Sequence, residues 1–336
     1  MAVRASALGL RDLPKVELHV HLGGTITVDL ALELARRRRT RLAALRDGGY
    51  PRRYGDFAAF LRTYVAVNDL VRTPEDLFLV ASAFAGEQAR LGVRYTEATF
   101  TAMTYVRGGI PPPELWAALR EGFVEGGGDV DVRLIVDVIR DFGEDEAAAT
   151  VRLVEAADAP IVALGLTGIE GSVPLERFRP LRQAADRLGL GLVVHAGETG
   201  PASSVRQTLD VLAPDRIAHG VAAAREPALV ARLAAQGTPL DVCLTSNVAT
   251  GMFRSLDEHP FGSLWRAGVR LTVSTDDPPF FGTTLEEELG HAARIVGLDR
   301  SEVAALQRGA LEASFAPQAV RHEVRAAIDR WDERPR

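Results

Sequence analysis

The chain has 336 residues, of which 47% are hydrophobic and 25% charged, with a formal net charge of −6. This composition allows a large buried core, and the acidic balance disfavours nucleic acid as a partner, so we expect the arginine-rich segment 35–46 to be a solvated helix face. A single cysteine (Cys243), no apolar secretion signal in residues 1–12 and no apolar run of ~18 residues predict a cytoplasmic protein without disulfides or membrane partners.

Short apolar segments rich in β-branched residues recur along the chain and predict eight strands. They cover residues 15–22, 92–100, 132–139, 161–168, 190–198, 216–221, 239–247 and 269–277. After the first, successive segments begin on the order of 25 to 40 residues apart, which is the length of a strand followed by a helix.

The segments between the strands carry helix start and stop signals. In residues 73–92, Thr73 predicts an N-cap, Pro74 the first helical position and Gly92 the end. Similar signals predict helices over residues 111–123, 143–159, 174–189 and 226–237. Eight buried strands that alternate with helices predict parallel pairing and an α/β fold of the (β/α)₈ TIM barrel type, with an open doubly wound sheet as the alternative.

Two regions exceed the simple barrel pattern. The interval between the first two strands is too long for one crossover helix, so we expect a helical insertion over about residues 25–90, with helices near 30–39 and 56–71. After the eighth strand, further helices are expected over residues 285–298, 300–315 and 317–333. No linker-like or low-complexity stretch interrupts the chain, so residues 1–336 are predicted to form a single domain.

Unusual polar residues gather where four of these strands end. They are His19 and His21 in the first, His195 and Glu198 in the fifth, His219 in the sixth, and Asp276 and Asp277 in the eighth. One buried histidine is usually a core residue with satisfied hydrogen bonds, and paired aspartates before a proline usually form a turn. Four strand ends together are harder to explain in this way, because in a barrel they converge at the mouth that carries the active site.

A bound metal ion accounts for this convergence with few assumptions. His19 and His21 are two residues apart and therefore project from the same face of a strand. With His195 and Asp276 they would supply three imidazoles and one carboxylate, a set that suits Zn²⁺ and leaves a position for water. Zinc can lower the pKa of such a water from 15.7 to about 7.

Three polar residues remain for the chemistry. His219 and Asp277 are suited to orienting the water and taking its proton. Glu198 lies three residues beyond the proposed ligand His195, where it can act as a general acid towards a substrate.

Five segments then match a known family in order and spacing, from about residue 12 to residue 330. They are LPKVELHVHLGG (13–24), HAGE (195–198), RIAHG (216–220), TSN (245–247) and STDDPPFFGTTL (274–285). Together they resemble the adenosine deaminase family of metal-dependent amidohydrolases. The resemblance implies a barrel with one catalytic zinc ion per chain. It also implies hydrolytic removal of the 6-amino group of an adenosine-type nucleoside, which leaves an inosine-type product and ammonia.

The resemblance also implies roles for individual residues, with His19, His21, His195 and Asp276 on the zinc ion. Glu198 would protonate purine N1, and His219 and Asp277 would position and activate the water. Gly168 would bring its backbone against the purine, where a side chain would block the approach. Asp277 would also form a hydrogen bond with N7.

The segment HLGG departs from the family pattern at Gly23, where relatives carry an acidic residue that contacts the sugar hydroxyls. Its loss should weaken selection for a free 5′-hydroxyl, and we expect it to open space. The substrate is then either a 5′-modified adenosine, such as the aminodeoxyfutalosine that some family members deaminate, or adenosine bound through residues 69–72 or 100–106. Adenine and a nucleoside of secondary metabolism are further alternatives.

Other classes of protein fit less well. The zinc deaminases that act on bases in nucleic acid need several cysteines, which this chain lacks. Many two-metal amidohydrolases use a lysine after the fourth strand, whereas the chain's one lysine is Lys15, so a mononuclear site is favoured. A barrel that only binds its ligand should have lost a metal ligand or the acid, and none is missing. The sequence does not predict an oligomeric state.

Two further sets of residues have less specific interpretations. His259, His291 and His322 are expected to be surface or capping groups, although the loop 255–261 could border the pocket. Four residues with helical spacing could form either core or a lid over the purine. They are Phe57, Phe60, Leu61 and Tyr64.

Overall fold

The computed structural model describes residues 8–42, 45 and 48–334. Most of the segment inspected for a secretion signal, and Arg46 at the end of the arginine-rich segment, lie outside the described residues. Within the described part, no helix is both long and apolar enough to cross a membrane.

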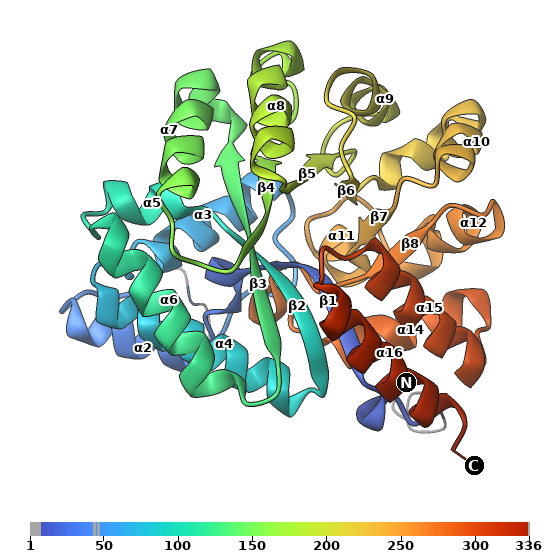
Figure 1. Cartoon of the computed structure of the whole chain (residues 1–336), viewed down its shortest axis with the longest axis horizontal. Helices are drawn as coiled ribbons and strands as arrows, with labels where there is room; N and C mark the ends of the chain where they lie inside the picture. Colours follow the sequence, from blue (N-terminus) through green and yellow to red (C-terminus); the bar gives the residue numbers. More distant parts are fainter. Residues whose placement is uncertain (1–7, 43–44, 46–47, 335–336) are drawn as a thin grey trace.

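Eight parallel strands form one sheet in the order β1 to β8, surrounded by helices (Figure 1). The strands are β1 (Lys15–His21), β2 (Val93–Phe100), β3 (Asp131–Ile139), β4 (Ile161–Thr167), β5 (Gly191–Ala196), β6 (Arg216–His219), β7 (Leu240–Val242) and β8 (Leu271–Val273). The predicted (β/α)₈ TIM barrel is therefore confirmed. The alternative, an open doubly wound sheet, is excluded because β1 also contacts the residues that follow β8.

The barrel closes between β1 and the residues that follow β8. Val20 pairs with Asp276 in a parallel bridge. The backbone N–H of Asp276 donates to the carbonyl of His19 at 3.0 Å, and that of His21 donates to the carbonyl of Asp276 at 2.8 Å. The contact that closes the barrel thus also brings Asp276 beside both histidines of β1.

Helices cover the outside of the strands. They are α2 (Val28–Arg37), α3 (Phe57–Asn68), α4 (Pro74–Arg90), α5 (Ala102–Arg107), α6 (Pro112–Gly127), α7 (Gly143–Glu155), α8 (Arg179–Leu188), α9 (Ala202–Val211), α10 (Pro227–Gln236), α11 (Leu244–Ala249), α12 (Phe261–Arg266), α13 (Pro278–Phe281), α14 (Leu285–Val296), α15 (Arg300–Ala313) and α16 (Gln318–Asp332). As expected, α2, α3 and α4 lie between β1 and β2, and α14, α15 and α16 follow β8.

The structure differs from the sequence expectation at the end of the seventh strand. The segment 239–247 was predicted as one strand, but only Leu240–Val242 is extended and Leu244–Ala249 is helix α11. A helical turn at the barrel mouth allows the buried side chains of Ser246 and Asn247 to reach the site. Ser246 hydrogen-bonds to Asp276, and Asn247 hydrogen-bonds to His219. The short helices α5, α9 and α12 were also not predicted.

The arginine-rich segment lies mainly on α2 and pairs with acids of the same chain. Arg36 and Arg37 both contact Glu33, one turn earlier on the helix. Arg38 contacts Asp76 at the start of α4. These three cations of the described part of the segment are therefore paired with carboxylates of the same chain.

Candidate metal centre and active site

The seven polar residues picked out at the strand ends come together at one end of the barrel. All except the partly exposed His21 are buried. The Nε2 atoms of His21 and His195 are 3.2 Å apart. Asp276 Oδ1 lies 3.4 Å from His19 Nε2 and 3.3 Å from His21 Nε2. Three imidazoles and one carboxylate therefore point at a common centre.

The donor atoms at this centre fit a cation. Both ring nitrogens of His19 are buried and make no hydrogen bond within the described part of the chain. Burial lowers the pKa of His21 to about 4, and burial with the neighbouring imidazoles holds the pKa of His195 well below its usual value. Both rings are then neutral, which is the form that binds metals. The ligand atoms of His19, His21 and His195 lie within 4.8 Å of one another, as do those of His19, His219 and Asp276.

The charge state of Asp276 supports the same interpretation. Burial alone would raise its pKa, but the imidazoles of His19, His219 and His21 hold the pKa well below the ordinary value. Its Oδ2 also accepts a hydrogen bond from Ser246 Oγ at 2.6 Å. In spite of burial, Asp276 also raises the pKa of His19, so this buried carboxylate favours a positive charge beside it. A buried anion is costly unless a cation accompanies it.

Two of the four described non-glycine residues with a positive φ lie at the same place. His219 and Asp276 adopt φ angles of 63° and 67°, in the left-handed region that side chains other than glycine rarely occupy. Such residues cost of order 1–3 kcal/mol each and are found mostly at functional sites.

Two further acids, Glu198 and Asp277, lie in surroundings that favour the uncharged, protonated form of their carboxyl groups. Burial, followed by the charge of Asp276, raises the pKa of each well above its ordinary value. Glu198 Oε2 lies 3.7 Å from His219 Nε2. Asp277 Oδ1 is buried without a partner, and a Cβ atom at Gly24 would lie 1.7 Å from it. Gly24, which the sequence analysis passed over, therefore leaves the room that Asp277 occupies.

The loop that carries Glu198 is held by Glu170, a residue missed in the sequence. The Glu170 carboxylate accepts hydrogen bonds from the backbone N–H groups of Gly197, Glu198, Thr199 and Gly200 at 2.7–2.9 Å. A hydrogen bond from the Ser204 hydroxyl, together with these backbone bonds, holds the pKa of Glu170 low despite burial. The sequence shows this acid in the segment GLTGIEG. An acid that follows a strand can have many roles, so its position alone does not predict this one.

Two predicted substrate-binding glycines have close contacts of their own. Gly168 has a φ of 96°, and a Cβ atom there would lie 2.3 Å from Asp141 Oδ2. The expectation that Gly23 opens space is wrong. A Cβ atom at position 23 would lie 2.1 Å from Asn68 Oδ1 and 2.8 Å from the Tyr64 hydroxyl, because α3 brings both side chains into this space.

The helix α3 also carries the aromatic stripe that was left open as lid or core. Phe60 is buried and packs against Phe281, with ring centroids 5.0 Å apart. Tyr64 lies 5.8 Å from the ring of Phe280. Phe280 and Phe281 belong to α13, which begins directly after Asp277. Helix α3 therefore packs against the segment that follows this site residue.

The expectation that His259 lies at the surface is wrong, but it does act as a capping group, because its ring accepts the N–H of Phe261, the first residue of α12. His259 is only 5% exposed and joins a hydrogen-bond chain with Asn247 and the backbone of Phe261. The backbone N–H of Phe253 donates to the carbonyl of Asn247 at 3.1 Å, so the loop after α11 turns back towards this helix. His291 is partly buried on α14, and His322 is exposed on α16.

Asp137 is a third buried acid close to the site. It lies on β3, and both carboxylate oxygens are buried without a hydrogen-bond partner in the described structure. Burial raises its pKa to about 7. A Cβ atom at Gly165 on β4 would lie 2.7 Å from Asp137 Cβ, so a glycine is needed beside it. The sequence signal was one acid within an apolar strand.

Comparison with known proteins gives the family. The sequence profile described as "Adenosine deaminase" matches residues 14–331. An aminodeoxyfutalosine deaminase from Streptomyces avermitilis is 39% identical over 96% of this chain and 92% of its own length. An adenine deaminase from Chelativorans is 36% identical over 94% of this chain and 98% of its own length.

Solved structures agree in fold. An adenine deaminase from Arthrobacter aurescens has a TM-score of 0.85 at 29% identity, covering 95% of this chain and 99% of that one. An amidohydrolase from Burkholderia ambifaria, solved with bound zinc, has a TM-score of 0.89 at 26% identity and covers 99% and 93% of the two chains. The resemblance recognised in the five sequence segments is thus confirmed: the chain belongs to the adenosine deaminase family of hydrolases, which remove amino groups from purines.

Proposed function

We propose that this protein is a zinc-dependent deaminase that removes the 6-amino group of a 5′-modified adenosine by hydrolysis. The observation that carries the chemistry is the meeting of three imidazoles and Asp276 beside two acids, Glu198 and Asp277, whose pKa values are raised. The observation that favours the substrate is the lack of a side chain at Gly23, whose nearest neighbours are the Asn68 amide and the Tyr64 hydroxyl.

His19, His21, His195 and Asp276 would hold the zinc ion. The unpartnered ring nitrogens of His19 and the neutral state of the other two rings suit this role. A relative from Burkholderia ambifaria is described with bound zinc, which supports the choice of metal. When bound, zinc would supply a water with a pKa near neutrality as the attacking group.

Glu198 would protonate N1 of the purine. Its raised pKa favours the protonated carboxyl group, and the Glu170 carboxylate fixes the loop on which it lies. Protonation of N1 withdraws electrons from C6, so that this carbon accepts a nucleophile more readily. Gly168, at the end of β4, would let its backbone approach the same edge of the purine.

Asp277 and His219 would orient the attacking water, and Asp277 would bind N7 of the purine as well. Asp277 Oδ1 is buried and unpartnered, and the raised pKa of this carboxyl group favours the protonated form, which can donate a hydrogen bond to N7. His219 Nε2 lies 3.8 Å from Asp276 Oδ2 and faces the same centre.

The sugar end of the site is where this chain differs from the family pattern. At Gly23 there is no carboxylate to accept a hydrogen bond from a 5′-hydroxyl, and the amide of Asn68 and the hydroxyl of Tyr64 lie there instead. Asn68 is already engaged, since it accepts from the Tyr105 hydroxyl at 2.7 Å and donates to the carbonyl of Gly23 at 3.3 Å. A substrate without a free 5′-hydroxyl suits this arrangement, and aminodeoxyfutalosine is such a substrate.

Free adenine is the second candidate. Several relatives named adenine deaminase are about as similar as the aminodeoxyfutalosine deaminases, at 35–37% identity against 38–39%. The close packing of α3 on α13 also covers the region next to Asp277.

The test is a substrate panel that differs only beyond the purine. We expect kcat/KM for aminodeoxyfutalosine and other 5′-modified adenosines to exceed that for adenosine by about tenfold or more. The reaction is measured by the loss of the 6-aminopurine absorbance. Faster turnover of adenosine than of every 5′-modified analogue would contradict the argument from Gly23. Fastest turnover of adenine would establish the second candidate.

A further inference from the structure

We propose that Asn247 and His259 are positioning residues that keep the proton of neutral His219 on Nε2, so that His219 acts as a hydrogen-bond donor at the reacting centre. The role of His219 in the reaction rests on the proposed function. The arrangement itself rests on a chain of hydrogen bonds that runs inwards from the barrel surface.

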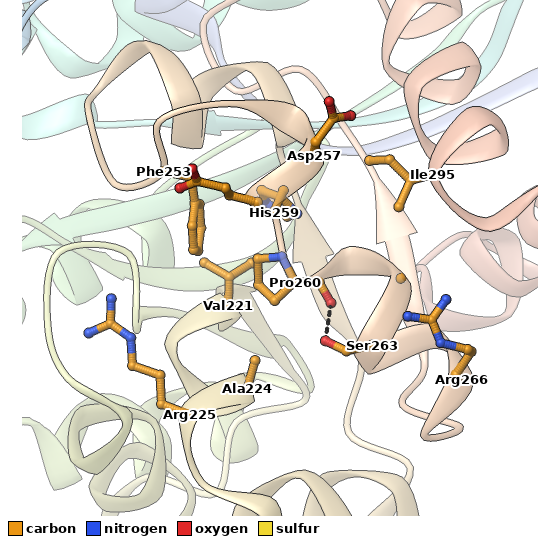
Figure 2. A pocket seen from close by; sticks show the side chains of 12 residues that line it. Val221, Ala224, Arg225, Phe253, Asp257, His259, Pro260, Ser263, Arg266 and Ile295 are labelled. Atoms are coloured by element: carbon orange, nitrogen blue, oxygen red, sulfur yellow. Dashed lines mark hydrogen bonds between the residues drawn. The ribbon is translucent and has the colours of Figure 1, made fainter.

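The outer end of the chain is His259, which follows the short 3-10 helix η6 (Leu256–Glu258). It forms part of the wall of a surface pocket of about 410 Å³, together with Val221 and Pro260 (Figure 2). Its ring packs edge-on against Phe253, with centroids 4.9 Å apart, and its Nδ1 atom accepts the backbone N–H of Phe261 at 3.1 Å. These contacts fix both the position and the orientation of the ring.

The polarity of the chain follows from that backbone donor. A backbone N–H can only donate, so Nδ1 of His259 must be the unprotonated nitrogen and the ring proton lies on Nε2. Burial lowers the pKa of His259 to about 3, so the ring stays neutral. Nε2 lies 3.1 Å from Asn247 Oδ1, to which it donates. The amide nitrogen of Asn247 then faces His219 Nδ1 at 3.2 Å and donates to it.

The consequence appears at the inner end. Because Nδ1 of His219 accepts a hydrogen bond, the proton of the neutral ring is on Nε2. That atom faces the site, 3.7 Å from Glu198 Oε2 and 3.8 Å from Asp276 Oδ2. His219 therefore presents an N–H to the centre and has no free lone pair there with which to take a proton.

This arrangement divides the roles that sequence reasoning left shared between His219 and Asp277. Because His219 offers no lone pair there, the proton released by the attacking water goes to a carboxylate of the site and not to His219. His219 donates to the oxygen on which negative charge develops. A donor fixed in advance at such a position is one of the larger single contributions to catalysis.

The first experiment compares two substitutions at His259, which itself contacts neither the metal ligands nor the proposed acids. His259→Leu removes the donor to Asn247, leaves the amide free to turn, and should lower kcat about 10- to 100-fold with KM within about threefold. His259→Gln places an amide nitrogen near the former Nε2 position and should restore kcat to within about threefold of the wild-type value. A merely structural role would instead change thermal stability and KM together, and glutamine would not rescue selectively.

The second experiment reads the proton directly in the wild-type protein. Nitrogen NMR of ¹⁵N-histidine-labelled, zinc-loaded protein distinguishes protonated from unprotonated ring nitrogens, and a His219→Gln variant assigns the resonances. We expect a protonated Nε2 and an unprotonated Nδ1 for His219. A proton on Nδ1, or full kcat in His259→Leu, would overturn the proposal. Failure of the wild-type protein to deaminate any 6-aminopurine would contradict the proposed function and leave the NMR result standing.

Discussion

The interior of the barrel contains two buried ionic clusters that differ in how completely their polar atoms are paired. One lies near the middle of the barrel around Arg216, between Glu97 on β2 and Asp241 on β7. The other is the mouth cluster around His19 and Asp276. Both lie inside the ring of parallel strands, so they share a buried environment and differ in their partners.

In the central cluster every charged atom has a partner within the chain. Arg216 donates to Glu97 Oε2 at 2.6 Å and to Asp241 Oδ2 at 2.9 Å. The remaining oxygen of Glu97 accepts from the Tyr95 hydroxyl at 2.7 Å, and that of Asp241 accepts from the Thr272 hydroxyl at 2.7 Å. The guanidinium also stacks on the ring of Phe315.

In the mouth cluster, several buried atoms have none. Both nitrogens of His19, one oxygen of Asp277 and both oxygens of Asp137 lack hydrogen bonds within the described residues. Buried polar atoms without partners cost free energy, and proteins rarely leave them so. The charged atoms of the central cluster thus find all their partners within the folded chain. The unpaired atoms of the mouth cluster are instead available to a metal ion or a substrate. Substitutions in the two clusters should therefore have different consequences.

The largest effect is expected from Glu198→Gln at the mouth. Glutamine keeps the shape but cannot donate a proton to the purine as an acid, so kcat should fall about 10²- to 10⁴-fold. Bound zinc and thermal stability should be retained, because Glu198 is neither a proposed ligand nor paired with a cation. Elemental analysis and steady-state kinetics measure both. Retention of most activity would show that another group protonates the purine, and loss of zinc together with activity would place Glu198 on the metal.

The central cluster should respond in stability instead. Arg216→Met leaves Glu97 and Asp241 buried without their cation, and breaking such a pair costs about 3–5 kcal/mol. Urea unfolding should show this loss in the free energy of unfolding. Zinc bound per folded chain should stay the same. An equally stable variant would mean that the central ions contribute little, contrary to the comparison.

The same comparison explains what the sequence could and could not predict. The strands, the barrel and the seven mouth residues were predictable because hydrophobic period, strand spacing and the ends of β1, β5, β6 and β8 follow from local pattern. Glu170, Asn247 and His259 were not, since each acts through a contact with a residue far along the chain. Gly23 shows the limit most clearly: the vacant space expected from a missing side chain is filled by Asn68 and Tyr64 from α3, which only the packing of the insertion determines.

Asp137 offers a test of the unpaired atoms through pH. Its pKa is raised from 3.8 to about 7, so the folded protein binds a proton that the unfolded chain has lost, and stability must fall as pH rises from about 4 to about 7. Asp137→Asn removes this dependence. The stability gained by the variant over the wild-type protein should grow by roughly 2 to 3 kcal/mol between pH 5 and pH 8.

Unfolding curves of both proteins at the two pH values measure that gain. Asp129→Asn is the matched control, because the Asp129 side chain is 90% exposed and precedes the same strand. A constant difference between Asp137→Asn and wild type would mean that Asp137 is charged and paired in solution.

The smallest effects come from one hydroxyl in each cluster. Ser246 Oγ donates to Asp276 Oδ2 at 2.6 Å, and Thr272 Oγ1 donates to Asp241 Oδ1 at 2.7 Å. Removing either donor should cost about 1 kcal/mol, but the cost should appear in different quantities. Ser246→Ala frees an oxygen of a proposed metal ligand and should weaken zinc affinity about tenfold or more, measured by competition with a chelator. Thr272→Val should lower the free energy of unfolding and leave zinc affinity unchanged. If both variants weaken zinc binding equally, the two clusters are coupled through β7 and β8. The zinc affinity of the mouth cluster would then depend on the hydrogen bonds of the central cluster.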